Sequence, residues 1–286
     1  MSELEKHLSK KPPEVLFHYT NQSGLLGIID TFEIWATKIL YLNDTTELLL
    51  AFEMAKEELD KRRLDSGDPD KYRKVEILQH KIDSWKSINL FVCSFSEDGD
   101  SLSQWRAYGN STSSFSIGFS SAHLKQMALN NEFVLAKCIY DEKSQRDLIT
   151  DLVVRALRKD FALNPNRLFD LVDPEPDKIA EECVAELARL APILKHKSFS
   201  EEKEWRLISG LTSHEHPLFS FRQGASMIAP YFRFPLREGN DLPKIVKLVV
   251  GPTPHEILAA ESADMLLRKK GLDIEVVVST IPLRNY

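Results

Sequence analysis

The sequence predicts an α+β fold in which one domain, residues 1–286, carries a helical insertion at about residues 141–195. Short apolar stretches bounded by turn residues recur along the chain and predict strands. Apolar residues at helical spacing mark two longer segments in the second half, which predict a pair of amphipathic helices packed beside the sheet. Strands and helices follow one another in a mixed order, which is typical of the α+β class.

Composition and charge are those of an ordinary globular protein. The 286 residues are 43% hydrophobic and 28% charged, and the formal net charge of −6 argues against nucleic-acid binding over the whole surface. Cys93, Cys138 and Cys183 are too widely spaced to predict a disulfide framework or a zinc site. We expect a cytoplasmic protein, because residues 1–13 lack the apolar segment of a secretory signal and no apolar run is long enough to span a bilayer.

The first organised stretch joins a strand to a helix. Residues 16–20 predict a short buried strand, and either Asn21 or Ser23 can cap the following helix with a side-chain oxygen. On this strand His18 shares a face with the hydroxyl of Thr20, because alternate side chains point the same way. His18 is suited to hold a polar ligand at this junction, although a core histidine bonded to the backbone fits the same pattern.

The other elements are predicted in the same way, strands from apolar runs between turn residues and helices from apolar residues three or four apart. The first half contains a mobile lead-in (1–13), a strand (33–37), a helix with Leu48, Phe52, Ala55 and Leu59 on one face, a loop (65–70), a helix (71–85), a strand (89–95), a helical turn (101–109) and strands at 115–119 and 133–140. The second half contains a helix with Leu148, Ile149, Leu152, Val153 and Ala156 on one face, a helix with Ile179, Cys183, Leu187, Leu190 and Leu194, strands at 199–208, 217–221, 227–234 and 245–250, a helix (254–270) that ends at Gly271, and a closing strand (274–279).

The strongest candidate for chemistry is the segment Glu202-Lys203-Glu204-Trp205-Arg206. If this segment is a strand, Glu202 and Glu204 share a face and lie about 6.6 Å apart along it. One carboxylate can then stabilise an oxocarbenium-like centre while the other handles an incoming nucleophile. Arg206 on the same face favours the ionised form of Glu204. A charged, solvated strand edge is the alternative interpretation.

Residues 101–109 are the second candidate. Trp105 and Tyr108 can form an aromatic wall for a planar ring, and Arg106 can contact a phosphate. The alternative is that the two aromatic side chains belong to the core.

Signals for other chemistries are weak. The chain has no Gly-rich phosphate loop, dinucleotide fingerprint or nucleophile elbow. Glu201 and Lys203 imitate the acidic-x-Lys element of metal-dependent nucleases, but no upstream metal-binding aspartate is identifiable, so we expect no metal. His214 and His216 lack a third ligand nearby. Seven basic residues fit a local nucleic-acid patch and scattered surface charge equally well: Lys195, His196, Lys197, Arg206, Arg222, Arg233 and Arg237.

These motifs together resemble a bacterial domain-of-unknown-function family, some members of which are linked to abortive infection and phage defence. The strand at 16–20 and the helix after it are similar to the first strand and helix of the ADP-ribosyltransferase fold. The residues that carry the resemblance follow the expected order along nearly the whole chain: His18-Tyr19-Thr20, Trp35-Ala36-Thr37, Tyr41-Leu42-Asn43-Asp44 with Glu47, Ser103 to Gly109, Glu202 to Arg206, and Ser279 to Arg284.

The resemblance implies a split, mostly antiparallel sheet of the ADP-ribosyltransferase type, with NAD as the substrate and no metal. It implies that His18 and Glu204 are catalytic: His18 would hold the nicotinamide-side ribose, and Glu204 would stabilise the charge at the anomeric carbon. Glu202 would occupy the position of acceptor-activating residues. The middle motif of the family is not recognisable by spacing, so the residue that stacks on nicotinamide stays open. The implied NAD-binding residues are His18, Tyr19, Thr20, Trp105, Arg106 and Tyr108.

We therefore expect an NAD-dependent mono-ADP-ribosyltransferase, a toxin-like or phage-defence effector that modifies a protein or nucleic acid. An antitoxin or chaperone partner is compatible with such a role, and no membrane is involved. The alternatives are an NAD glycohydrolase, a non-catalytic module that binds a nucleotide or partner in the same cleft, and, third, a metal nuclease. His18, Glu202 and Glu204 in one cleft would favour the enzyme, whereas Glu204 held wholly by Arg206 would favour the binding module.

Overall fold

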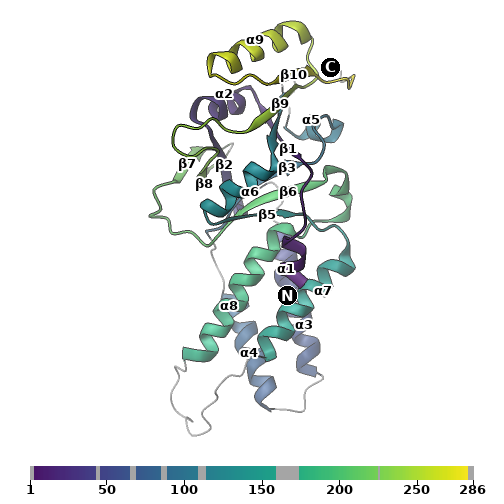
Figure 1. Ribbon diagram of the computed structural model, residues 1–286. Helices are drawn as coiled ribbons and strands as arrows, with labels where there is room; N and C mark the ends of the chain where they lie inside the picture. The colour runs from purple at the N-terminus through teal and green to yellow at the C-terminus, as the bar shows by residue number, and fades with distance from the viewer. Residues whose placement is uncertain are drawn as a thin grey trace.

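The described strands form one open, mostly antiparallel sheet (Figure 1). The computed structural model describes residues 3–42, 46–64, 69–84, 89–108, 114–158, 174–224 and 226–282. The strands follow the order β10-β9-β4-β1-β3-β2-β8-β7, with β6 on the other edge of β3 and β5 beside β6; β10 runs parallel to β9, and the other described pairs are antiparallel. The strands are β1 Val15–Asn21, β2 Glu33–Lys38, β3 Phe91–Ser96, β4 Ser114–Ser120, β5 Phe133–Lys137, β6 Glu204–Ser209, β7 Phe219–Gln223, β8 Ile228–Pro235, β9 Ile245–Val250 and β10 Glu275–Val278.

The sheet splits at β3. β6 pairs along one edge of β3, while β1 and β2 share the other edge at its two ends. Phe17 of β1 lies opposite Ser96, and Thr37 of β2 lies opposite Val92. The carbonyl of Ser94 therefore faces the gap between β1 and β2, which is where the candidate site lies.

Helices pack against this sheet to form its core. Leu25 and Ile29 of α2, Leu124 and Met127 of α6, and Leu267 of α9 are buried in one cluster with side chains of the strands. The helices are α1 Glu3–Leu8, α2 Gln22–Thr31, α3 Thr46–Leu64, α4 Pro69–Ser84, α5 Leu102–Tyr108, α6 Ser121–Asn130, α7 Glu142–Arg158, α8 Pro174–Leu190 and α9 Glu256–Lys269, with 3₁₀ turns η1 Ile39–Tyr41, η2 Ala191–Ile193 and η3 Lys197–Glu202.

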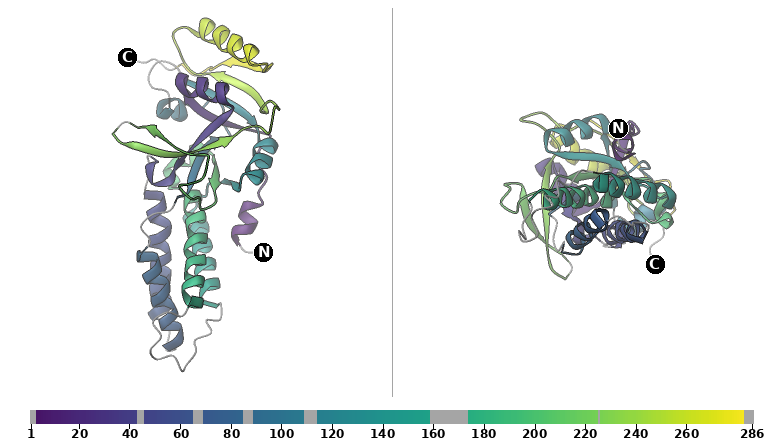
Figure 2. Two further views of the ribbon diagram at one scale, coloured as in Figure 1. Left: turned by 90° about the vertical axis from the view of Figure 1, so that its left-hand side faces the viewer. Right: turned by 90° about the horizontal axis from the view of Figure 1, so that it is seen from below.

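Four long helices, α3, α4, α7 and α8, form a bundle that projects from the sheet (Figures 1 and 2). Leu59, Leu78, Leu152 and Leu187, one from each helix, lie in its core. Sheet residues Val92, Ala136 and Ile208 belong to the same cluster. The bundle and the sheet therefore share buried surface where they meet.

Most of the predicted elements are confirmed, including the cap of α2, where Oδ1 of Asn21 accepts a hydrogen bond from the Gly24 amide at 2.9 Å. The prediction of a mobile lead-in was wrong, because it contains α1, whose His7 is buried and bonds the carbonyl of Lys137. The helix α6 was not predicted. The two helices of the predicted insertion form, but α3 and α4 complete a bundle with them. Of the predicted features, the loop at 65–68 and residues Asn43, Asp44, Trp85, Gly109, Leu283 and Arg284 lie outside the described residues.

Candidate functional site

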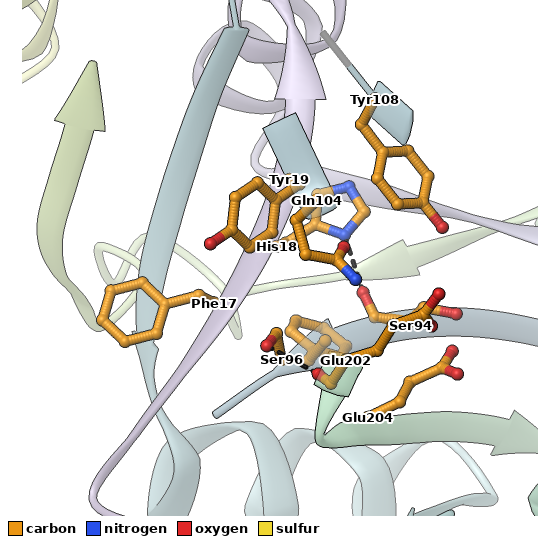
Figure 3. A pocket seen from close by; sticks show the side chains of 10 residues that line it. Phe17, His18, Tyr19, Ser94, Ser96, Gln104, Tyr108, Glu202 and Glu204 are labelled. Carbon is orange, nitrogen blue, oxygen red and sulfur yellow. Dashed lines mark hydrogen bonds between the residues drawn. The ribbon is translucent and has the colours of Figure 1, made fainter. Parts of the chain in front are cut away.

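The candidate site is a cleft made of two adjoining cavities beside the split in the sheet. The inner cavity, about 30 Å³, reaches Glu202 and Glu204, and the outer cavity, about 430 Å³, runs along β2 and the start of α2. His18, Tyr19 and Tyr108 line both. The inner cavity is drawn in Figure 3, where the carboxylates lie below the ring of His18. The outer cavity has the size typical of small-molecule sites.

His18 is held across the split as a neutral ring. Its Nδ1 donates a hydrogen bond to the carbonyl of Ser94 at 2.9 Å, and Nδ1 therefore carries the proton. Burial lowers the pKa of His18, although the bond to Ser94 opposes this effect. In the neutral ring Nε2 remains an acceptor for a ligand hydroxyl. His18 thus has features of both interpretations. As in a core histidine, one ring nitrogen bonds the backbone; as in a site histidine, the ring lines the cleft.

Glu204 is a buried carboxylate between two cations. It is the first residue of β6 and is 4% exposed. Nε and Nη2 of Arg206 lie 2.7 and 3.1 Å from its two oxygens, and Nζ of Lys195 lies 2.5 Å from Oε2. Burial alone would raise the pKa of Glu204, but the charges and hydrogen bonds of Arg206 and Lys195 outweigh it and hold the pKa at about 2. Glu204 is therefore ionised over the physiological pH range.

Glu202 reaches the cleft by a different route from the one predicted. The expectation of one strand through 202–206 was wrong: Glu202 ends the 3₁₀ turn η3, and Lys203 takes a left-handed conformation with φ of 44° before β6 begins. This turn still brings Glu202 beside Glu204, because Nζ of Lys195 also contacts Oε2 of Glu202 at 2.6 Å. Oε1 of Glu202 has no bonding partner in the described part of the chain.

The helix α5 supplies one aromatic residue to the cleft, and that residue is Tyr108. Tyr108 and Gln104, one turn apart, both line the inner cavity. Tyr108 is 43% exposed; its partial burial, and then the charges of Glu204 and Glu202, raise the pKa of Tyr108 to about 12. The ring therefore stays neutral and is available for stacking.

Trp105 and Arg106, both predicted to bind NAD, lie elsewhere. Trp105 is 1% exposed; it packs edge-to-face on Tyr19 and donates from Nε1 to Asp100 at 2.8 Å. Arg106 is exposed on the far side of α5 from the cavities and lines neither of them. The helical period explains both corrections, since Gln104 and Tyr108, four residues apart, share the face that meets the cleft.

Tyr19 and Thr20 both contribute to the cleft, in different ways. The Tyr19 ring lines the cavities, while its hydroxyl donates to the carbonyl of Asp98 at 2.8 Å and is therefore fixed. Thr20 lines the outer cavity, and Gly24 of α2 packs against it so closely that a Cβ at Gly24 would lie 1.9 Å from Oγ1 of Thr20. Glycine at this position thus allows α2 to approach β1.

Sequence reasoning missed the role of Lys195. It was grouped with six other basic residues that fitted a nucleic-acid patch and scattered surface charge equally well, but Lys195 and Arg206 are buried in the carboxylate cluster. Ser94 and Ser96 line the inner cavity as well, and no local motif distinguished them. Gln104 also lines it; it lay in the motif Ser103 to Gly109 but was given no role. Among the described residues, no group of three His, Cys, Asp or Glu side chains is placed to hold a metal ion.

Comparison with known proteins supports the family resemblance in its coarser form. A family model described as "Protein of unknown function (DUF2971)" matches residues 104–207, less than half of the chain. The matched segment includes Gln104, Tyr108, Lys195, Glu202 and Glu204. No curated protein and no solved structure gives a significant match. In the described residues, no helix has the length and apolar character needed to cross a membrane.

Proposed function

We propose that the protein is an NAD-dependent mono-ADP-ribosyltransferase, a toxin-like or phage-defence effector that modifies a protein or nucleic acid. The observation that carries the proposal is the meeting of His18, Tyr108, Glu202 and Glu204 around one cleft (Figure 3). A neutral histidine can bind a ribose hydroxyl, an aromatic ring can stack on nicotinamide, and a carboxylate can stabilise a developing positive charge. The effector role rests on the family resemblance alone.

In the proposed reaction, the bond between the nicotinamide nitrogen and the ribose anomeric carbon breaks, and nicotinamide leaves with the bonding electron pair. The ribose then carries positive charge, as in glycoside cleavage. An oxygen or nitrogen of the acceptor attacks the anomeric carbon and gives its proton to a carboxylate. We assign this carboxylate to Glu202, because Oε1 of Glu202 has no bonding partner among the described residues, whereas Glu204 is held by Arg206 and Lys195.

Nicotinamide release from NAD, with cell extract as the source of acceptors, tests the proposal. Glu202→Gln is expected to lower the rate by about 10²–10³-fold, within the range typical when a positioned general base is removed. Glu201→Gln is the matched control, since Glu201 lies in the same turn, is exposed and does not line the cavity. Label from NAD on a macromolecule would indicate a transferase, and free ADP-ribose would indicate a glycohydrolase. No release, with no NAD binding by calorimetry, would contradict both.

The ion pairs of Glu204 favour a second candidate, a non-catalytic module that binds a nucleotide or partner in the same cleft. Both carboxylate oxygens of Glu204 accept hydrogen bonds from Arg206, and Oε2 also contacts Lys195. A carboxylate so engaged is suited to a structural role. Tight nucleotide binding without nicotinamide release would support this candidate over the enzyme.

A further inference from the structure

Arg222 lies in the wall of the outer cavity and has no counter-ion among the described residues. It lies on the edge strand β7, and its side chain reaches over β8 to β2, where Nη2 donates to Oγ1 of Thr37 at 3.2 Å. Its Nε is buried and has no hydrogen-bond partner among the described residues, and no described carboxylate forms an ion pair with it. A buried N–H without a partner is destabilising, and such groups are rare in native proteins.

Arg233, on the neighbouring strand β8, differs from Arg222 because its guanidinium has both a hydrogen-bond acceptor and a counter-ion. Arg233 donates to the carbonyl of Pro217 at 3.1 Å and lies 3.6 Å from the carboxylate of Glu33. Glu33 also lines the outer cavity, but its charge is matched by Arg233 and not by Arg222. No described residue that lines the cavity therefore compensates the positive charge of Arg222.

The rest of the outer cavity suits the nucleoside part of a ligand. Trp35 of β2 lines the cavity, is 47% exposed and packs on the ring of Tyr231 with a centroid distance of 4.5 Å. Its free face is available for a planar base. Ser23 and Gly24, in the first turn of α2, line the same cavity, and the N-terminal end of a helix carries positive partial charge.

We propose that Arg222 and Thr37 form a phosphate subsite for a nucleoside diphosphate in the outer cavity, with the base against Trp35. A guanidinium binds phosphate oxygens through two parallel N–H groups, so the unpartnered Nε and an Nη group of Arg222 can act together. The proposal deepens the proposed function and rests on it for the identity of the nucleotide, because NAD carries a diphosphate between its two nucleosides. The subsite itself requires binding and no turnover.

Calorimetric titration with ADP and with adenosine tests the subsite, because these probes differ only in the diphosphate. The wild-type protein is expected to bind ADP at least about tenfold more tightly than adenosine. Arg222→Gln is expected to weaken ADP binding by about 10- to 100-fold and to leave adenosine binding unchanged. Arg222→Lys keeps the charge without the planar pair of N–H groups. Its affinity for ADP is expected to lie between those of the wild type and Arg222→Gln. Arg237→Gln is the matched control, because Arg237 packs on the ring of Phe32 and does not line the cavity; it should bind ADP as the wild type does.

Three results would overturn the subsite: equal or undetectable binding of both probes by the wild type, an unchanged ADP affinity in Arg222→Gln, or an equal loss in Arg237→Gln. Circular dichroism of each variant shows whether it is folded. The outcome is separable from that of the proposed function. Selective loss of ADP binding in Arg222→Gln, with no nicotinamide release by the wild type, would keep the subsite and reject the transferase. Nicotinamide release by the wild type, with an ADP affinity that Arg222→Gln leaves unchanged, would keep the enzyme and reject the subsite.

Discussion

At the scale of single residues, the buried charge of Glu204 links the site to the stability of the fold. Arg206, which holds Glu204, also donates from Nη1 to the carbonyl of Pro192 at 2.6 Å. Lys195, which contacts both carboxylates, has its own carbonyl bonded by Gln145 of α7 at 2.9 Å. Glu204 is therefore fixed from β6 by Arg206, and both carboxylates are fixed by Lys195, which lies in the segment after α8.

Replacement of Glu204 by Gln is expected to reduce stability in a pH-dependent way. The pKa of Glu204 is held at about 2, below its ordinary value of 4.5. Such a carboxyl stabilises the fold above pH 4.5, and this contribution is lost as the pH falls from 4.5 towards 2. Glu204→Gln should therefore be less stable than the wild type by on the order of 3 kcal/mol at pH 7, and the two should converge near pH 2.

Urea unfolding at several pH values between 7 and 2.5 measures this difference. Glu201→Gln, an exposed neighbour, should follow the wild type throughout. A gap between wild type and Glu204→Gln that stays constant with pH would refute the assigned charge state.

The sequence predicted the identities of the site residues better than their geometry. His18 lies in the cleft because strand alternation is a local rule that β1 obeys. Glu202 and Glu204 also meet there, but through a 3₁₀ turn and a left-handed Lys203. The left-handed conformation is uncommon for lysine, so the residue type does not predict it. Arg222 joins the outer cavity from a distant edge strand, so no local spacing could have placed it.

At the scale of elements, the two glycines of α2 give opposite predictions. A Cβ at Gly24 would clash with Oγ1 of Thr20 at 1.9 Å, whereas a Cβ at Gly27 would meet nothing within 4 Å. Gly24→Ala is expected to destabilise the protein by about 1–3 kcal/mol, because α2 must move away from β1. Gly27→Ala is expected to stabilise it by about 0.5–1 kcal/mol, since alanine favours the helix. Thermal or urea unfolding compares them, and equal effects of the two substitutions would rule out the close approach.

The elements themselves were largely predictable, whereas their partners were not. Periodicity marked α3, α7 and α8 one by one, because a stripe of apolar residues depends only on nearby residues. Such a stripe shows that a helix has a buried face but not which element covers it. The four-helix bundle, which joins segments from both halves of the chain, therefore emerged only in the structure.

At the scale of the whole molecule, the bundle and the sheet are expected to unfold together. Val92, Ala136 and Ile208 of the sheet belong to the bundle core. In the segment after α8, Pro192 accepts a hydrogen bond from Arg206, and Lys195 contacts both carboxylates. Loss of the bundle would remove these contacts from the site. Shared buried surface of this kind favours one cooperative transition over two.

Leu187→Ala tests this coupling from the bundle side. Leu187 of α8 is 0% exposed, and its truncation should cost about 2–5 kcal/mol. Leu64→Ala, at an 82% exposed position on α3, should stay within about 0.5 kcal/mol of the wild type. Circular dichroism follows the helices, and tryptophan fluorescence includes Trp35, Trp105 and Trp205 in the sheet region. Because one core spans both regions, Leu187→Ala should shift both urea midpoints equally. A fluorescence midpoint that stays at the wild-type value while the helical signal shifts would make the bundle an independent unit, and the carboxylates would then be held by the sheet alone.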